Sequence, residues 1–284
     1  MAARLGTVVA LARETVTRWS EDKASTLAAA LAFYALFSLA PLVLIAVSVA
    51  GLVFGHRAAE GQLYAQLAGV MGDATARSVE RLVANLYQER SGGILATVIG
   101  LATLLFGASK LFVQLQDSMN TIWKAMPPKA AGFRGVLRAR LLSFSMVVAL
   151  GVLLLLSLIL SAVGAYLTAF LPRGAGIGEA LDETTGLVVL TGLFAMVYKV
   201  LPDTRVAWRD VWLGALVTSA LFTVGRVGFG FYLGRAAVAS SYGAVSSVMI
   251  LLLWIYYSAM ILYLGAEFTH VYSIRHGSRR TFAA

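Results

Sequence analysis

Long runs without a charged side chain are the feature that most constrains this sequence. Three of them, Ala24–Gly55, Leu141–Pro172 and Ala236–Ala266, are longer than the ~20 residues that a helix needs to cross a bilayer. A fourth, Ser91–Ser109, falls just short of that length. Apolar residues make up 59% of the 284-residue chain and charged residues 13%, roughly half the charged share of an ordinary soluble domain. The sequence therefore predicts an all-α, polytopic integral membrane protein.

The hydropathy pattern predicts six transmembrane helices. The fourth has a short charge-free stretch and depends on Lys199 reaching the membrane interface, and the fifth is interrupted by Arg226. The predicted spans are 25–54, 92–116, 139–171, 184–202, 207–234 and 244–272.

The sequence predicts three regions: an N-terminal helix, a transmembrane domain and a C-terminal tail. Residues 1–24 form an amphipathic helix on the cytoplasmic membrane face, because their apolar residues recur at helical spacing. The transmembrane domain covers 25–272 and includes a helical outer loop at 56–91, and a basic cytoplasmic tail follows at 273–284. The apolar stripe of the first helix consists of Leu5, Val8, Val9, Ala12, Val16 and Trp19.

The distribution of Lys and Arg predicts the orientation. Most of these residues fall on one side of the membrane when the N-terminus is placed in the cytoplasm, so both termini are predicted to be cytoplasmic. The net charge of +9 is then explained by topology, and no nucleic-acid partner is expected. We expect a multi-pass protein of the bacterial plasma (inner) membrane, and the sequence leaves a homo-oligomer open. Contacts with anionic inner-leaflet headgroups are expected at Lys124, Lys129, Arg134, Arg138 and Arg140.

Motifs for catalysis are missing from the sequence. The chain has no cysteine, which excludes disulfides and thiolate metal sites. Its three histidines lack metal-ligand spacing, and there is neither a Walker A sequence nor a G-x-S-x-G motif. We therefore predict no enzymatic activity, no cofactor and no metal site.

Ionisable residues within the spans are the first candidates for function. Glu267 directly follows the charge-free run Ala236–Ala266, and His270 lies one helical turn later. These two residues are the plausible proton carriers. Lys110 on the second helix reaches a similar depth. Two interpretations are open: Lys110 and Glu267 form an ion pair, or each reaches the interface separately.

Polar residues on the second and fifth helices add further candidates. Lys110, Gln114, Asp117 and Thr121 share one helical face, which either lines a vestibule or bonds to neighbouring helices, and Asn120 lies beside them. Arg226 either contacts an anion or reaches outward to the interface. Pro41 is predicted to kink the first helix.

Four stretches carry a family resemblance: LAAALAFYALFSLAPL, LFGASKLFVQLQDSMNTIW, LPDTRVAWRDVWLGAL and SSYGAVSSVMILLLWIYYSAMILYLGAEFTH. In this order and with this helix layout, the chain resembles the YihY/virulence factor BrkB family of inner-membrane proteins from about residue 15 to 272. The resemblance implies an all-helical membrane fold. At Met260 this chain departs from the glutamine common in relatives. The matching motif residues are Phe33, Tyr34, Ser38, Pro41, Gln114, Leu115, Asn120, Trp123, Pro202, Gly214, Tyr242, Gly243, Trp254, Tyr256, Tyr257, Gly265, Ala266 and Glu267.

The leading hypothesis for function is transport or flipping of an amphipathic envelope lipid or lipid-linked substrate. The resemblance implies a link to envelope lipid or lipopolysaccharide transport, which some members of the family have. The alternative is a non-transporting scaffold or assembly factor. A distant alternative is the ribonuclease activity implied by an old family label, for which the sequence offers no residues that could hold catalytic metals.

Overall fold

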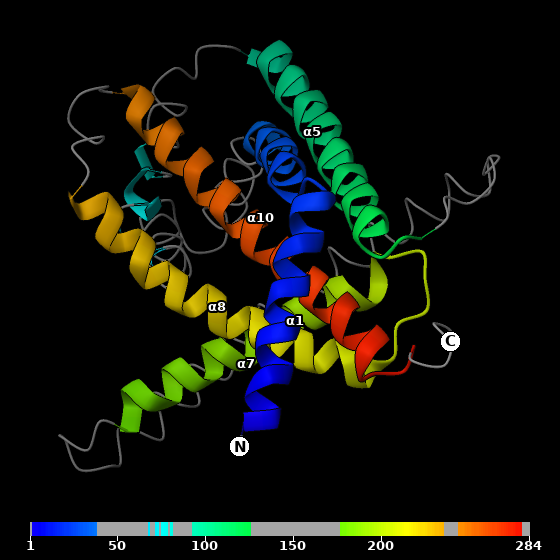
Figure 1. Ribbon diagram of the computed structural model, residues 1–284. Coiled ribbons are helices and arrows are strands. Elements are labelled where there is room, and N and C mark those ends of the chain that lie inside the picture. The colour runs from blue at the N-terminus through cyan, green and yellow to red at the C-terminus, as the bar shows by residue number, and fades with distance from the viewer. Residues whose placement is uncertain are drawn as a thin grey trace. The chain divides into compact units, whose positions relative to one another are not determined.

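A computed structural model gives the fold, and it describes residues 2–38, 68, 72–73, 75–78, 80–81, 93–125, 177–235 and 244–279. Every regular element within these residues is helical, which confirms the all-α fold class for the part of the chain described (Figure 1). The long helices are α1 (Ala2–Glu21), α5 (Gly93–Ile122), α7 (Ile177–Val200), α8 (Trp208–Arg235) and α10 (Ala244–Arg275). Residues 24–38 are also helical.

The helix ends test the sequence prediction directly. Helices α8 and α10 begin and end within three residues of the fifth and sixth predicted spans. Helix α5 continues to Ile122, whereas the predicted span ends at 116. The predicted span followed the end of the apolar run, and the residues up to Thr121 were expected on the same helix, which ends where Lys124 adopts φ 50°. There the Ala125 N–H donates to the Asn120 carbonyl at 2.9 Å and closes a Schellman turn.

Two helical segments, Trp208–Tyr232 and Val248–Arg275, are long and apolar enough to cross a membrane. Two shorter apolar helical segments, Ala24–Ser38 and Thr184–Val200, overlap the first and fourth predicted spans. The six-span topology itself stays a prediction. Outside the described residues lie the predicted span 139–171, most of the loop 56–91, and the residues Pro41, Lys129, Arg134, Arg138, Arg140, Tyr242 and Gly243.

The chain divides into two compact units. The first unit comprises Met1–Asp22, Gln116–Leu221 and Leu262–Ala284. The second comprises Lys23–Leu115 and Phe222–Ile261. The predicted boundaries at 24 and 272 separate cytoplasmic from transmembrane residues, which is a different division from these two packing units. They stay a prediction.

In the first unit, α8 and α10 approach each other through a repeated five-residue pattern. The sequence reads GALVT at 214–218 and GAEFT at 265–269. A Cβ atom placed on Gly214 would lie 1.8 Å from the Thr269 Oγ1, and one on Gly265 would lie 1.9 Å from the Thr218 Oγ1. Each threonine therefore occupies the space left by a glycine of the other helix, and the pairing order shows that the helices are antiparallel. Small residues four apart permit such close packing of membrane helices.

In the second unit, aromatic side chains pack the other halves of the same two helices. The Phe229 ring centre lies 5.2 Å from that of Trp254 and 5.4 Å from that of Tyr257. Gly225 on α8 leaves the space that the Tyr257 hydroxyl occupies. These contacts give Tyr257, a residue of the family motif, a packing role.

Helix α8 carries an exposed apolar face along its whole length. A buried helix in a soluble core would cover such residues, whereas a lipid-facing helix leaves them on its surface. This face therefore suits contact with hydrocarbon. Its members are Trp208, Trp212, Leu216, Val224, Val227 and Phe231.

Candidate functional site

Glu267 is an unusual polar residue within the described part of the first unit. Its side chain is 0% exposed, and neither carboxylate oxygen has a hydrogen-bond partner within the described part of the chain. The charged side chains that act on it are Asp22, Lys124 and Arg18. We call these four residues with His270 the Glu267 cluster. Burying a carboxyl group without hydrogen bonds costs folding free energy. The Glu267 cluster therefore does not simply stabilise the fold, as an ordinary packing contact would.

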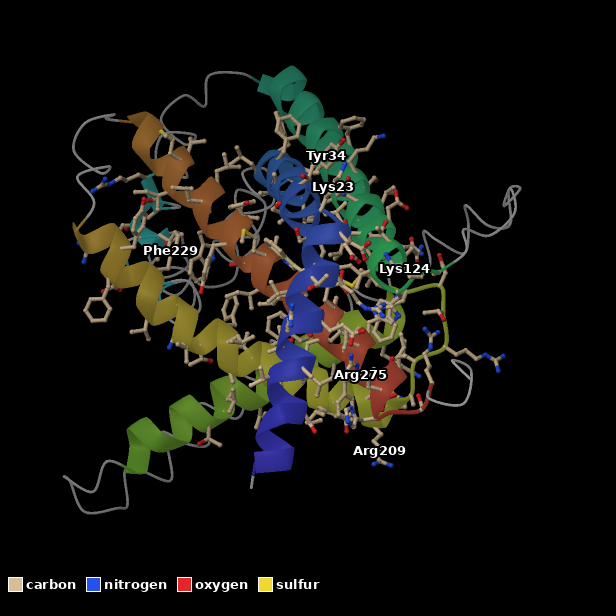
Figure 2. The ribbon with its side chains drawn as sticks, in the orientation of Figure 1. Lys23, Tyr34, Lys124, Arg209, Phe229 and Arg275 are labelled. Atoms are coloured by element: carbon tan, nitrogen blue, oxygen red, sulfur yellow. The ribbon has the colours of Figure 1, made fainter. Side chains whose placement is uncertain are left out.

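The cations of the Glu267 cluster are already engaged by other carboxylates. The Lys124 ammonium donates to Asp22 Oδ1, and the Arg18 guanidinium donates to Glu14 Oε1 at 3.0 and 3.1 Å. Glu14 also pairs with Arg275, and Figure 2 labels Lys124 at the end of α5 and Arg275 at the end of α10. Lys124 and Arg18, the cations near Glu267, are therefore each hydrogen-bonded to a different carboxylate.

Lys110, the partner considered from the sequence, belongs to the second unit. Its side chain is exposed, and its Nζ lies 5.8 Å from the centre of the Phe106 ring. An ion pair between Lys110 and Glu267 stays a prediction.

His270 lies one turn after Glu267 and is also buried, with 3% of its surface exposed. Its Nδ1 has no hydrogen-bond partner among the residues described. The imidazole ring centre lies 5.2 Å from that of Trp123, and the Arg279 guanidinium carbon lies 5.5 Å from the Trp123 ring centre. The structure thus places both candidate proton carriers in one buried polar region.

Asn120 contacts the loop that follows α7. Its Nδ2 donates to Asp203 Oδ2 at 2.9 Å, and the Asp203 backbone N–H donates to Asn120 Oδ1 at 2.8 Å. Gln116 adds a third bond to Asp203 at 3.3 Å. Partial burial and the Asp203 carboxylate raise the pKa of Asp117, which lies beyond the predicted span. Asn120 and Gln116 therefore bond the end of α5 to another segment, whereas the role of the stripe Lys110, Gln114, Asp117 and Thr121 stays a prediction.

A buried hydroxyl pair holds α7 against α8 and α10. The Tyr198 hydroxyl donates to the Leu262 carbonyl at 2.8 Å and lies 3.0 Å from the Thr218 Oγ1. Thr218 in turn donates to the Gly214 carbonyl at 2.7 Å. These bonds satisfy the buried hydroxyl groups beside the glycine contacts, so this region is structural.

The other sequence candidates lie in the second unit. Gln114 and Arg226 are both half-buried there. Tyr34 contacts Phe33 edge-on with ring centres 5.6 Å apart, and the Ser38 hydroxyl donates to the Ala35 carbonyl within its own helix. Tyr256 is half-buried.

Asp210 at the start of α8 is hydrogen-bonded to the tail, and its sequence context did not mark it as a candidate. Its carboxylate is 1% exposed, and Oδ2 accepts bonds from the Ser278 N–H at 3.0 Å and from the Ser278 hydroxyl at 2.7 Å. A Cβ on Gly277 would lie 2.5 Å from Asp210 Oδ1, so only glycine permits this approach.

We expect Asp210→Ala to lower the free energy of unfolding by about 1–3 kcal/mol, because two Ser278 donors lose their acceptor. Thermal unfolding in detergent, followed by tryptophan fluorescence, measures the change. Glu21→Ala at the exposed end of α1 is the matched control and should have little effect. Equal stability of the two variants would contradict the role given to Asp210.

Two membrane-length helical segments and an exposed apolar face on α8 are features of a helical membrane protein. Comparison with known proteins agrees. The family model described as virulence factor BrkB matches residues 15–284, so the chain belongs to the virulence factor BrkB family. This confirms the resemblance found in the sequence.

Several UPF0761 membrane proteins are similar to this chain. One from Ralstonia nicotianae is 32% identical over 263 residues, which cover 90% of this chain but 57% of the relative. One from Cronobacter sakazakii is 30% identical over 280 residues, covering 95% of this chain and 90% of the relative. One from Pseudoalteromonas atlantica is 26% identical over 268 residues, covering 92% and 85%. No solved structure matches the chain.

Proposed function

We propose that this protein crosses the bacterial plasma membrane six times and moves an amphipathic envelope lipid or lipid-linked substrate between the leaflets. The observation that carries the proposal is the buried Glu267 carboxylate, which has no hydrogen-bond partner in the described part of the chain. It lies within the membrane-length segment Val248–Arg275. An ionisable group placed there is costly, and such groups usually serve function.

The nature of the spans supports a lipid substrate over a hydrophilic one. A hydrophilic solute needs a polar path across the whole membrane, whereas a lipid needs a lateral opening and a few contacts for its headgroup. The polar groups described above gather near one end of α10 and the start of α8, and the face of α8 is apolar. Glu267 and His270 supply the proton-carrying groups if transport is driven, and the basic segment 124–140 contacts anionic headgroups in the inner leaflet.

Lipid movement is tested with purified full-length protein in vesicles that contain a trace of fluorescent phosphatidylglycerol. A membrane-impermeant reductant quenches only outer-leaflet label in protein-free vesicles. We expect nearly complete quenching when the protein is present. Quenching equal to that of protein-free vesicles would contradict transport and favour the scaffold alternative. The proposal includes no enzymatic activity, and RNA cleavage by the purified protein that is lost in Glu267→Gln would contradict that part.

The orientation can be tested by cysteine labelling, because the chain has no cysteine of its own. An impermeant maleimide applied outside the plasma membrane should label Arg90→Cys and leave Arg134→Cys unlabelled until the membrane is opened. Labelling of Arg134→Cys from outside would contradict the proposed topology.

A further inference from the structure

A cavity of about 690 Å³ lies beside the tail of the first unit. It is formed by the loop that precedes α8 and by the end of α10 with the residues that follow it. Its volume is within the range of small-molecule sites. Its lining includes Thr204, Arg205, Val206, Ile274, Ser278 and Arg279.

Arg279 lines the cavity with hydrogen-bonding capacity to spare. Its Nη2 donates to the Thr204 hydroxyl and, at 3.4 Å, to the Arg205 carbonyl. Within the described residues it forms no ion pair, and its Nε and Nη1 have no hydrogen-bond acceptor. Partial burial lowers the pKa of Arg279, and the Asp210 carboxylate opposes that effect. A guanidinium in this state is suited to bidentate binding of an oxyanion.

The charges around the cavity favour an anion. Arg205 lines the cavity and is exposed, and the Lys199 ammonium donates to the Val206 carbonyl, which belongs to the lining. Two carboxylates lie nearby, and both accept hydrogen bonds from the protein: Asp210 from Ser278, and Asp203 from the amides of α5. No acidic residue lines the cavity itself among the residues described.

The position of the cavity matches the depth of lipid headgroups. It lies at the start of Trp208–Tyr232 and at the end of Val248–Arg275, the two membrane-length segments. Trp208 and Trp212 are each 51% exposed at that end of α8, and exposed tryptophan marks the membrane interface in membrane proteins. Val206 and Ile274 give the cavity an apolar wall beside its cations.

We propose that this cavity binds the phosphate group of an anionic amphiphile, with Arg205 and Arg279 as the anion ligands. The inference rests on the proposed function and deepens it, because it names a phosphate-bearing headgroup as the part of the substrate that is recognised. A phosphate diester in a lipid headgroup and a free phosphate present the same oxyanion chemistry, so the experiment has to separate these two sources.

Binding is measured on the full-length protein in nanodiscs made only of phosphatidylcholine. The probes are dioctanoyl phosphatidic acid, dioctanoyl phosphatidylglycerol, glycerol 3-phosphate and inorganic phosphate, each titrated while tryptophan fluorescence is recorded. We expect saturable binding that weakens tenfold or more in Arg205→Gln and in Arg279→Lys, because a bidentate contact is lost. Arg209→Gln, an exposed residue that does not line the cavity, is the matched control and should bind within twofold of the natural protein.

Each outcome decides the proposal. Binding of the two lipids alone assigns the site to a headgroup, and equal binding of inorganic phosphate assigns it to free phosphate. Absence of saturable binding by all four probes, or equal binding by the natural protein and Arg205→Gln, overturns the site. Since Arg205 is exposed, its substitution leaves the fold intact. If lipid moves between the leaflets but no probe binds the cavity, the proposed phosphate site is wrong and the transport function stands. If the probes bind but lipid does not move, the transport function is wrong and the site stands.

Discussion

Gly214→Ala should lower the free energy of unfolding by about 3 kcal/mol or more, because the added methyl group would lie 1.8 Å from the Thr269 Oγ1 and 2.7 Å from its Cβ. Threonine is branched at Cβ and cannot turn both heavy atoms away from the new methyl group. The helices α8 and α10 must then separate. Thermal unfolding of the detergent-purified protein should show the midpoint falling by roughly 6 °C or more.

The steric explanation can be separated from a general effect of alanine. Gly228→Ala on the same helix is the control, because a Cβ there meets nothing within 4 Å, and we expect it to be neutral or slightly stabilising. The double variant Gly214→Ala with Thr269→Gly moves the small residue from one helix to the other and should recover much of the loss. Equal damage in the single and double variants would contradict the contact between α8 and α10.

Glu267→Gln should raise the stability of the protein by about 1–2 kcal/mol, because it replaces a buried carboxyl group, which lies beside Asp22 and has no hydrogen-bond partner among the described residues, with a neutral amide. The new amide also supplies N–H donors beside Asp22, whose Oδ2 is buried and equally without a partner in the described chain. Lipid movement in the vesicle assay should fall tenfold or more. A gain in stability combined with a loss of activity is typical of a functional group.

The control for this prediction is Glu21→Gln, which neutralises an exposed carboxylate at the end of α1 and should change neither measurement. A loss of stability in Glu267→Gln would instead mean that the carboxylate is held by a dedicated cation. In that case, recovery of stability on adding Lys110→Met would support the ion pair that the sequence suggested.

Much of the fold could be predicted from the sequence. The positions of α8 and α10 follow from the length of their apolar runs, and α5 continues past the predicted span end at 116 to Ile122, as the helical spacing of Asp117 and Thr121 indicated. For α1 the helix is confirmed, with Val9 and Val16 exposed while Leu11 and Thr15 are buried. Its predicted contact with the membrane stays a prediction.

The candidate site was predictable only in part. Glu267 and His270 stand out because a polar residue in an apolar run is visible in a single sequence. Asp22 lies in a polar segment, and Asp210 lies beside Arg209 in the first turn of the predicted fifth span, where charged residues are ordinary, so neither gave such a signal. The repeated pattern GALVT and GAEFT was visible and could have predicted the close contact, since glycine and threonine four residues apart suit helix packing.

By itself, the sequence determined that this chain is a helical membrane protein of the BrkB family, because hydrophobicity and motif order are properties of each segment alone. Only the tertiary structure decided that Lys124 pairs with Asp22, that Asp210 fastens the tail, and that Arg279 faces a cavity. The physical reason is that such contacts depend on which helices cross and at which residue. The spacing of residues within one helix does not show which charged side chain of another helix will contact it.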